Sequence, residues 1–219
     1  RATNKNEKVF VDPMTLDLTP TPQSDQQEDI SNQPVKPVSP GKSFFSELLQ
    51  TILLAALLYF AIDAVFARVR VLNISMQPTL YEGNIVLVNK LAYKFSDLQT
   101  GDVVIFHDPH NPEEDFIKRL IGKPGDLVVV KNGEVYVNGN ELDEPYIASE
   151  PGYAGTWQVP DNSIFVLGDN RNQSSDSHSW GFVPLTDVVG KALIVYWPLD
   201  EIKVVTHHQA NTAAADFNK

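Results

Sequence analysis

The sequence predicts a mostly β protein, with an antiparallel β-sheet or barrel-like domain preceded by one transmembrane helix and a disordered N-terminal tail. Three observations predict this fold class. After residue 67 short apolar runs alternate with turn residues, and no helical period of about 11 residues or more appears. A single long apolar stretch precedes these runs, and a proline-rich polar segment precedes that stretch. We therefore expect a tail over 1–43, an anchor helix over 44–67, a β-rich domain over 68–205 and a flexible tail over 206–219.

Both ends of the chain have the composition of unfolded segments. Residues 1–43 hold six of the fifteen prolines among Gln, Ser and Thr, with five basic and six acidic side chains. Such a stretch cannot bury enough apolar surface to offset the entropy lost on ordering, so we expect it to be disordered. Residues 206–219 are small and polar, and we expect them to fray, His207 and His208 included.

The apolar stretch FFSELLQTILLAALLYFAIDAVFA covers residues 44–67. Its charge-free centre, between Glu47 and Asp63, is fifteen residues long, whereas a membrane-spanning helix needs about 20. The whole stretch has 24 residues and carries both carboxylates near its ends, so it predicts one transmembrane anchor. The two acidic side chains leave a buried or interfacial helix open as the alternative. A cleaved signal peptide is not expected, because about 40 polar residues precede the stretch.

Seven apolar runs after the anchor predict strands, each bounded by turn residues. Asn132-Gly133, between two of these runs, is a strong signal for a two-residue hairpin turn, because both residues tolerate positive φ. The predicted strands are Ile85–Val88, Val103–Phe106, Phe116–Ile121, Leu127–Val130, Val135–Val137, Ile164–Leu167 and Ala192–Trp197.

Composition excludes several classes of function. The formal net charge of −11 argues against nucleic acid as a partner, because binding phosphates requires a basic face. The chain has no cysteine, which excludes a thiol nucleophile, a thiolate metal site and a disulfide framework. His107 and His110 have the spacing of metal ligands but no third ligand at a plausible spacing, so we expect no metal and no cofactor.

A serine and a lysine carry the most informative pattern. Ser75 opens the segment Ser75–Leu80, and Lys118 lies within the apolar run Phe116–Ile121. A serine hydroxyl is a poor nucleophile until a base takes its proton, and a lysine can be that base if burial keeps it neutral near pH 7. Adjacent side chains on a strand point to opposite faces, so Lys118 and Arg119 cannot share one face. One of these cations must therefore lie among apolar neighbours.

A third segment, Gly168–His178, is dense in hydrogen-bonding groups. It follows directly on the apolar run Ile164–Leu167, and a plain surface loop would not explain why such groups leave a buried strand. The arrangement fits a polar scaffold beside a site. Ser174, Asp176 and His178 are the residue types of a catalytic triad, but neighbours in sequence rarely face one another as a triad requires.

Together these segments resemble the type I signal peptidase (leader peptidase) family, of the kind found in cyanobacteria and plastids. The resemblance implies a membrane-anchored serine endopeptidase that removes signal peptides from exported preproteins after small-x-small sites, typically Ala-x-Ala. It implies a Ser/Lys dyad, an acyl-enzyme and no cofactor, with secretory preproteins and the lipid bilayer as partners. Four blocks carry the resemblance, in the family's order: Ser75–Leu80, Gly101–Phe106, Phe116–Asp126 (FIKRLIGKPGD) and Gly168–His178 (GDNRNQSSDSH).

The resemblance also implies roles for individual residues. Ser75 would attack the scissile carbonyl, and Lys118 would act first as general base and then as general acid. The backbone N–H of Ser75 would donate to the oxyanion. Ser174 matches the family serine whose hydroxyl orients the lysine. The polar residues that match those bracing the site are Asp169, Arg171 and Asp176.

Position 73 departs from the family pattern, in which a serine often stands two residues before the nucleophile and supplies a second oxyanion donor. Here the residue is Asn73, whose amide can also donate. Two alternatives are equally open: Asn73 serves the oxyanion, or the oxyanion hole relies on backbone donors alone. Ile74 also departs, since the family commonly has a small or acidic residue there.

The substrate class follows from the resemblance and from sterics. An extended substrate could pair as an added strand between the edges near Val69–Asn73 and Asp115–Lys118. Shallow pockets would then admit only small side chains. The residues expected to line them are Met76, Leu80, Phe116 and Ile117.

Charge does not indicate how the anchor is oriented, because Lys36 and Lys42 upstream balance Arg68 and Arg70 downstream. Family precedent places the tail in the cytoplasm and the catalytic domain on the periplasmic or lumenal side of a bacterial plasma or thylakoid membrane.

Two rival functions would also use a Ser/Lys pair or this fold. Self-cleaving repressors of the DNA-damage response use a similar dyad on a related β-fold, but they need a DNA-binding domain, which an acidic tail and a membrane helix do not provide. A catalytically inactive, membrane-anchored binding module of the same fold is the other alternative. The presence of both Ser75 and Lys118 argues against it.

Overall fold

The computed structural model describes residues 40–207, with side chains described from residue 44. The chain falls into two compact units, residues 1–46 and 47–219. Of the first unit only the start of helix α1 (Pro40–Val65) is described, and the second unit holds the rest of α1 and every described strand. The tail predicted before the anchor and the last twelve residues, 208–219, therefore lie outside the described residues, apart from 40–43 at the start of α1.

Helix α1 is the apolar stretch predicted to be an anchor. Its residues 44–65 are long and apolar enough to cross a membrane, since 22 residues at the helical rise span about 33 Å. Its most apolar stretch is entirely unburied, which excludes a helix buried in a protein core. The bounds differ from the expected 44–67, because α1 starts at Pro40 and ends at Val65. Phe66 and Ala67 already pair with strand β2 (Ile85–Asn89), where sheet hydrogen bonds replace those of the helix.

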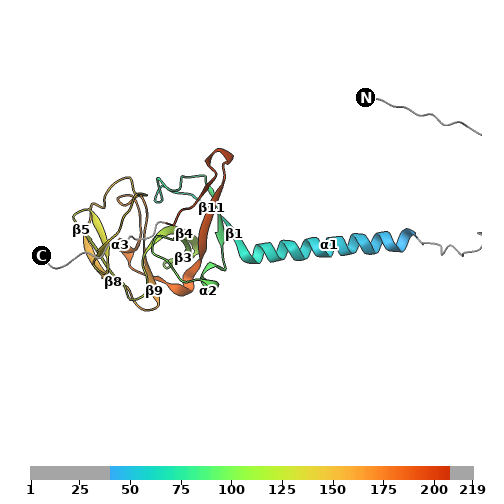
Figure 1. Cartoon of the computed structure of the whole chain (residues 1–219), viewed down its shortest axis with the longest axis horizontal. Coiled ribbons are helices and arrows are strands. Elements are labelled where there is room, and N and C mark those ends of the chain that lie inside the picture. Colours follow the sequence, from blue (N-terminus) through green and yellow to red (C-terminus); the bar gives the residue numbers. More distant parts are fainter. Residues whose placement is uncertain (1–39, 208–219) are drawn as a thin grey trace, which may run out of the picture. The chain divides into compact units, whose positions relative to one another are not determined.

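The larger of the two described sheets has eight strands, and every paired neighbour is antiparallel (Figure 1). Its edges are β1 and β10. In spatial order the strands are β1 (Phe66–Arg70), β2 (Ile85–Asn89), β11 (Val188–Trp197), β3 (Val103–Asp108), β4 (Asn111–Gly122), β9 (Ser163–Leu167) and β10 (Val183–Pro184), with β12 (Lys203–Val204) paired to β11.

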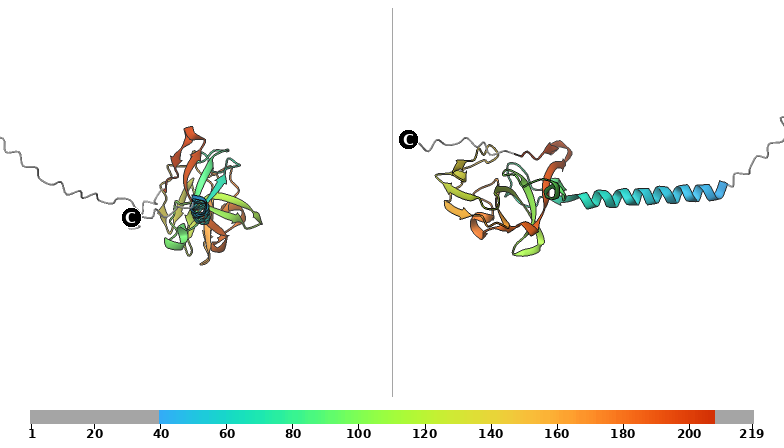
Figure 2. Two further views of the ribbon diagram at one scale, coloured as in Figure 1. Left: turned by 90° about the vertical axis from the view of Figure 1, so that its right-hand side faces the viewer. Right: turned by 60° about the horizontal axis from the view of Figure 1, so that its bottom comes forward.

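The smaller sheet has four strands and lies at the end of the β-domain away from β11 (Figures 1 and 2). Asn132 and Gly133, with φ of 54° and 85°, form the predicted hairpin turn, and Asn138-Gly139 repeats it with φ of 53° and 83°. In order its strands are β7 (Asn140–Glu141), β6 (Glu134–Val137), β5 (Leu127–Lys131) and β8 (Gly155–Gln158).

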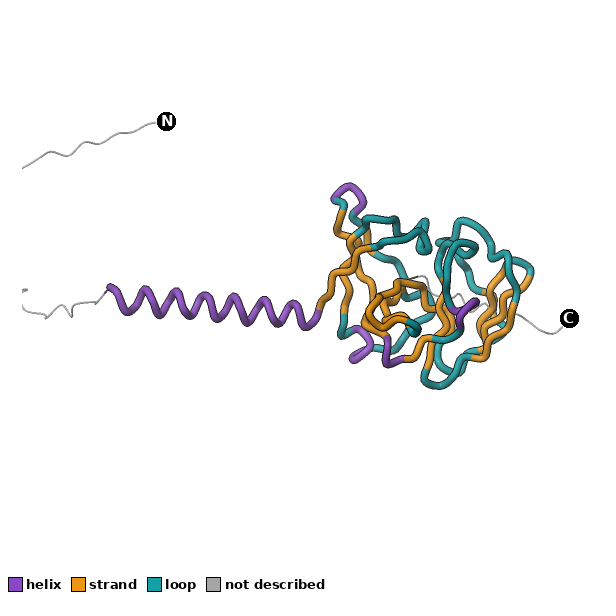
Figure 3. Tube along the Cα trace, turned by 180° about the vertical axis from the view of Figure 1, so that it is seen from behind, coloured by secondary structure: helices purple, strands orange, loops and turns teal. Residues whose placement is uncertain are grey.

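The prediction of a mostly antiparallel β fold is confirmed, and all seven predicted runs lie in strands. Five strands were not predicted from the sequence. β7, β8, β10 and β12 have only two to four residues, too few to show a period of two, and β1 starts within the stretch assigned to the anchor. Helical segments after α1 are single turns within the described residues (Figure 3). They are α2 (Ala92–Phe95), α3 (Ser177–Trp180), η1 (Leu185–Asp187) and η2 (Leu199–Glu201).

Strand β4 brings the polar segments of the sequence together. It is buried from Ile117 to Gly122, with β3 on one side and β9 on the other. Leu167, the last residue of β9, pairs with Arg119 of β4. The segment that begins at Gly168 therefore leaves the sheet beside Lys118.

The start of the predicted C-terminal tail is held in place, so the expectation of fraying is wrong for two of its residues. Thr206 O accepts a hydrogen bond from Arg119 Nη1 at 3.4 Å, and His207 Nδ1 lies 2.9 Å from Asp102 Oδ1. A buried carboxylate and a buried guanidinium supply partners that composition alone does not reveal.

Candidate active site

Ser75 lies in the nucleophile loop, residues 71–84 between β1 and β2, and is 5% exposed. Two turn hydrogen bonds shape this loop: Gln77 N–H donates to Ile74 O at 3.1 Å, and Leu80 N–H donates to Met76 O at 2.8 Å. The side chains of Met76 and Leu80 are fully buried in the core of the larger sheet. Core packing therefore positions the serine.

Lys118 projects from β4 onto this serine. Its Nζ donates to Ser75 Oγ at 2.7 Å, and the residue is 3% exposed. The same Nζ lies 5.5 Å from the centre of the Phe116 ring. The serine and lysine singled out by sequence are thus in direct contact.

Burial lowers the pKa of Lys118 to about 8, because the charged amine loses its water. The negative charges of Asp176 and Asp169 act in the opposite direction and raise this pKa. With a pKa near 8, about a tenth of the lysine is neutral at pH 7. A base is therefore available beside the serine at neutral pH.

Asn73 accepts hydrogen bonds from the nucleophile in this structure. Its Oδ1 lies 2.8 Å from Ser75 Oγ and 3.2 Å from Ser75 N, both of which donate to it. A backbone N–H can donate only to the oxygen of the amide, so the backbone sets the orientation of the side chain. The Ser75 N–H, the predicted oxyanion donor, is therefore already bonded to Asn73 in this structure.

The segment after β9 holds the nucleophile loop through its backbone. Asn170 N–H donates to Ser75 O at 3.0 Å, and Asn170 Nδ2 donates to Ile74 O at 3.2 Å. A Cβ on Gly168 would lie 2.5 Å from Ser75 O and 2.3 Å from Ser174 Oγ. Only glycine permits this close approach.

Ser174 lies beside Gly168 but makes no hydrogen bond to Lys118. Its Oγ is buried and has no hydrogen-bond partner among the described residues. The contact expected from the sequence is therefore not made in this structure, although the hydroxyl is left available for it.

Asp176 supports the same glycine. Its Oδ2 accepts from Gly168 N–H at 2.9 Å, and its Oδ1 lies 2.6 Å from His178 Nδ1. It also caps α3 by accepting from His178 N–H. The imidazole stacks on Tyr153, with ring centres 3.9 Å apart.

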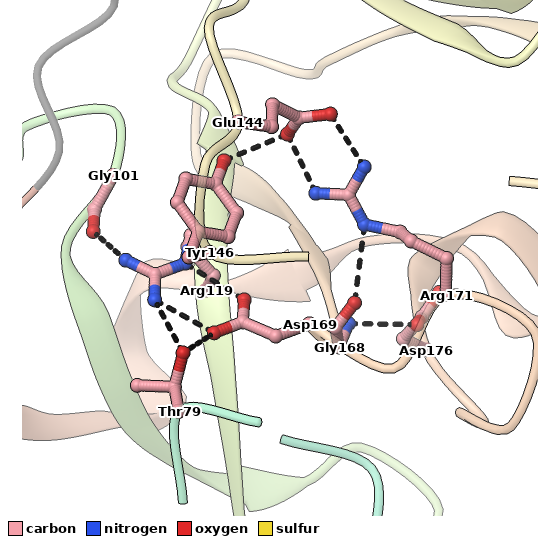
Figure 4. A network of polar contacts seen from close by, with 9 residues as sticks. All are labelled: Thr79, Gly101, Arg119, Glu144, Tyr146, Gly168, Asp169, Arg171 and Asp176. Atoms are coloured by element: carbon pink, nitrogen blue, oxygen red, sulfur yellow. Dashed lines mark hydrogen bonds and ion pairs between the residues drawn. The ribbon is translucent and has the colours of Figure 1, made fainter. Parts of the chain in front are cut away.

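Arg119 and Asp169 form a fully buried ion pair on the other face of β4 (Figure 4). Arg119 Nε and Nη2 each donate to Asp169 at 2.7 Å, and Thr79 Oγ1 donates to Asp169 Oδ2 at 2.5 Å. Lys118 and Arg119 are thus both buried, whereas the sequence predicted burial of only one of them. A guanidinium stays charged when buried, so it needs the carboxylate that Asp169 supplies.

A second buried pair lies next to the first (Figure 4). Arg171 donates to both oxygens of Glu144 at 2.6 Å, and its Nε donates to Gly168 O at 3.1 Å. Tyr146 donates to Glu144 at 2.7 Å, and its ring lies 3.8 Å from the Arg119 guanidinium carbon. The three predicted scaffold residues are therefore parts of one polar network around Gly168.

Two of the residues expected to line substrate pockets have no exposed surface. Met76 and Leu80 are 0% exposed and pack with Ile117, which is 6% exposed. Phe116 is partly buried against a different cluster, next to Phe106. The expectation of pocket-lining contact is wrong for Met76 and Leu80 in this structure, because the loop needs both as core anchors.

Several residues of the site were missed by sequence analysis. Each joins the site through a contact with a distant part of the chain, which residue spacing does not reveal. Arg119 alone could have been found, because it is the second cation next to Lys118 in an apolar strand. The missed residues are Thr79, Arg119, Glu144, Tyr146 and Asn170.

The histidines outside the site have carboxylate partners. His107 Nδ1 lies 2.8 Å from Asp115, and His110 Nδ1 lies 3.3 Å from Asp108. Within residues 40–207 no group of three or more His, Cys, Asp or Glu side chains is placed to hold a metal ion.

A buried serine hydroxyl in contact with a lysine of lowered pKa is the arrangement that a serine hydrolase with a lysine base requires. The family model described as signal peptidase, peptidase S26, matches residues 45–197. The chain belongs to this family, and the resemblance to type I signal peptidases is confirmed.

Three relatives illustrate the match. A probable signal peptidase I-2 of Synechocystis sp. is 41% identical over 78% of this chain and 82% of its own length. Signal peptidase I of Leptolyngbya laminosa is 40% identical over 84% of this chain and 93% of its own length. A crystal structure of a signal peptidase I from Enterococcus faecalis V583 has 33% identity and a TM-score of 0.41, covering 44% of this chain and 97% of that one.

Removing one charge of the buried pair tests how far the site depends on it. We expect Asp169→Asn to lower the free energy of unfolding by about 3–5 kcal/mol, because it leaves the Arg119 guanidinium buried without a counter-charge. Thermal or denaturant unfolding in detergent measures this. The double variant Asp169→Leu/Arg119→Met should be less destabilised than the single one. Equal stability of the single variant and the parent would show that the pair contributes nothing.

Proposed function

We propose that the protein is a membrane-anchored serine endopeptidase that removes signal peptides from exported preproteins. The observation that carries the proposal is the 2.7 Å contact between Lys118 Nζ and Ser75 Oγ in a buried site. Membership of the signal peptidase family and the single apolar helix α1 support it.

In acylation, neutral Lys118 takes the Ser75 proton as Oγ bonds to the scissile carbonyl carbon. In the resting structure the hydroxyl donates to Asn73 instead, so it must turn toward Nζ once the lysine is deprotonated. Collapse of the tetrahedral intermediate breaks the C–N bond. The Lys118 ammonium gives its proton to the leaving amine of the mature protein, and the signal peptide remains as an ester on Ser75.

In deacylation, Lys118 takes a proton from water as the water oxygen attacks the ester. The signal peptide leaves with a free carboxylate, and Ser75 recovers its hydroxyl proton from Lys118. The oxyanion is stabilised by the backbone N–H of Ser75, which Asn73 Oδ1 must release, or by Asn73 Nδ2 after the amide turns. Ser174, whose buried hydroxyl has no hydrogen-bond partner among the described residues, turns toward the lysine and orients it during this cycle.

The substrate binds as an added strand between two open edges. β1 is an edge of the larger sheet, and β4 pairs with β9 only from Arg119 onward, which leaves Asp115–Lys118 unpaired on that side. Phe116 and Ile117 line the small pockets, and the buried Met76 and Leu80 pack with Ile117 and limit the depth at that residue. Because such pockets are shallow, they admit only small side chains, which accounts for the preference for small-x-small sites.

The catalytic domain lies on the periplasmic or lumenal side of a plasma or thylakoid membrane, with the N-terminal tail in the cytoplasm. Helix α1 is the single-pass anchor in the lipid bilayer. This places Ser75 on the side where exported chains emerge.

Loss of either dyad residue should abolish cleavage. We expect detergent-solubilised protein to cut a model preprotein at one site, and Ser75→Ala, Lys118→Ala and Lys118→Arg to reduce kcat/KM by about 10³-fold or more. Arginine cannot be deprotonated in a protein, so it tests the base rather than the charge. Lys131→Arg, on the exposed hairpin, is the matched control. Cleavage retained by Lys118→Arg would rule out lysine as base, and an inactive parent would favour the binding module.

The rate should follow the deprotonation of Lys118. The lysine must be neutral to act, so we expect kcat/KM to rise about tenfold per pH unit below pH 8 and to level off above it. Cleavage of one preprotein from pH 5 to pH 10 measures this profile. A plateau that already begins near pH 6 would contradict the role of Lys118.

Side chains next to the cut should be restricted in size. With Ala at the first and third positions before the cut, we expect replacement of either by Leu to lower kcat/KM by about 100-fold. Replacement of the intervening residue should change it little. Faster cleavage of the Leu substrates would refute the shallow pockets.

A further inference from the structure

Residues 203–207 form a C-terminal strap on the catalytic domain, beyond the stretch that the family model matches. β12 pairs with β11, and Val205 N–H donates to Leu193 O at 2.9 Å. The Val205 side chain is 7% exposed and packs in the same core cluster as Met76 and Leu80 of the nucleophile loop.

The strap reaches the buried guanidinium of Arg119. Arg119 Nη1 donates to Gly101 O at 2.7 Å and to Thr206 O at 3.4 Å. The other nitrogens of Arg119 bind Asp169 and Thr79, which belongs to the nucleophile loop. The strap therefore contacts the strand of Lys118 directly, and through Arg119 it is linked to the loop of Ser75.

His207 ends the strap on a buried carboxylate. Its Nδ1 lies 2.9 Å from Oδ1 of Asp102, which is 1% exposed, and Lys191 Nζ lies 2.5 Å from the same oxygen. The His207 contact is one of distance and charge, since neither of its two atoms has a hydrogen-bond partner among residues 40–207. Oδ2 of Asp102 accepts from Tyr93 OH at 3.1 Å and from Gln99 N–H at 3.3 Å. The strap has two polar contacts, Thr206 with Arg119 and His207 with Asp102. Arg119 also binds the carbonyl of Gly101, the residue before Asp102, so both contacts involve the same turn.

The strap and the nucleophile loop face each other across a cavity of about 230 Å³. Pro78 and Thr79 line one side and residues 203–206 line the other, with Tyr146 between the two polar pairs. Lys203 Nζ also lies 5.5 Å from the ring of Tyr81, at the end of the loop. The strap thus lies next to residues 78–81 of the nucleophile loop.

We propose that the C-terminal strap, fastened by His207 to Asp102, is a positioning element of the peptidase that holds Arg119 and the nucleophile loop in register with Lys118. This inference rests on the proposed function. Without the strap, water reaches Arg119 and weakens its pair with Asp169. A loosened loop also lets water reach the Lys118 amine, which relieves the desolvation that lowers its pKa, while Asp176 and Asp169 continue to raise it. Ser75 is then held less tightly against the amine.

Two truncations of the 219-residue chain separate the strap from the residues that follow it. We expect removal of residues 203–219 to lower kcat by about tenfold or more while KM stays within about twofold, because alignment of the dyad is lost and the substrate edges remain. The acid limb of the kcat/KM profile should move to higher pH, since the pKa of Lys118 rises. Removal of residues 208–219 alone should change neither.

Point variants cover the case in which the longer truncation fails to fold. His207→Ala should reproduce part of the loss in kcat and the shift of the acid limb. His207→Asn, which places an amide nitrogen near the position of Nδ1, should restore both. His110→Ala is the control, since this histidine pairs with Asp108 on an exposed hairpin.

Hydrogen–deuterium exchange gives a readout that does not depend on cleavage. We expect faster exchange of peptides covering Ser75–Leu80 and Arg119–Gly122 in the 203–219 truncation and in His207→Ala, but not in the 208–219 truncation. If the parent cleaves no preprotein, the proposed function fails while exchange still tests the strap. Unchanged exchange, an unmoved acid limb with only a lower Tm, or equal losses in both truncations would overturn the inference.

Discussion

The burial of one lysine amine against one serine hydroxyl is the constraint on which the rest of the site depends. An exposed amine at Lys118 would stay protonated at neutral pH and could only donate to Ser75. Burial in the interior of β4 lowers its pKa to about 8 and makes it a base within reach of the hydroxyl. The fold makes this contact possible by placing β4 beside the nucleophile loop, which is anchored in the core by Met76 and Leu80.

The two neighbouring cations of β4 show how burial acts on different side chains. Lys118 can lose its proton, so desolvation lowers its pKa and raises the neutral fraction at a given pH. Arg119 cannot, so the same desolvation demands a counter-charge, and Asp169 provides one with two hydrogen bonds. The ion pair then fastens the segment after β9 to the nucleophile loop through Thr79. One strand thereby carries Lys118 on one face and, on the other, the arginine that supports the loop of Ser75.

Much of the fold and part of the site could be predicted from local sequence. The alternation of apolar runs with turn residues located seven strands, and Asn132-Gly133 located a hairpin, because these signals act within a few residues. Local signals failed where a distant partner decides the outcome. Met76 and Leu80 resemble pocket residues by position yet fill the core, Phe66 and Ala67 extend the apolar stretch yet pair with β2, and His207 resembles a tail residue yet meets Asp102.

The sequence by itself determined the chemical types at the site, the order of its segments and the family to which the chain belongs, because residue identity and spacing carry that information. Tertiary structure alone decided that Lys118 touches Ser75 and that Asn73 Oδ1 accepts a hydrogen bond from the Ser75 hydroxyl. It likewise decided that Ser174 Oγ has no hydrogen-bond partner within residues 40–207. It also decided how Arg119, Glu144 and the strap brace these groups. The reason is physical: hydrogen bonds, desolvation and ion pairing depend on distances of a few ångströms between residues that lie tens of positions apart in the chain.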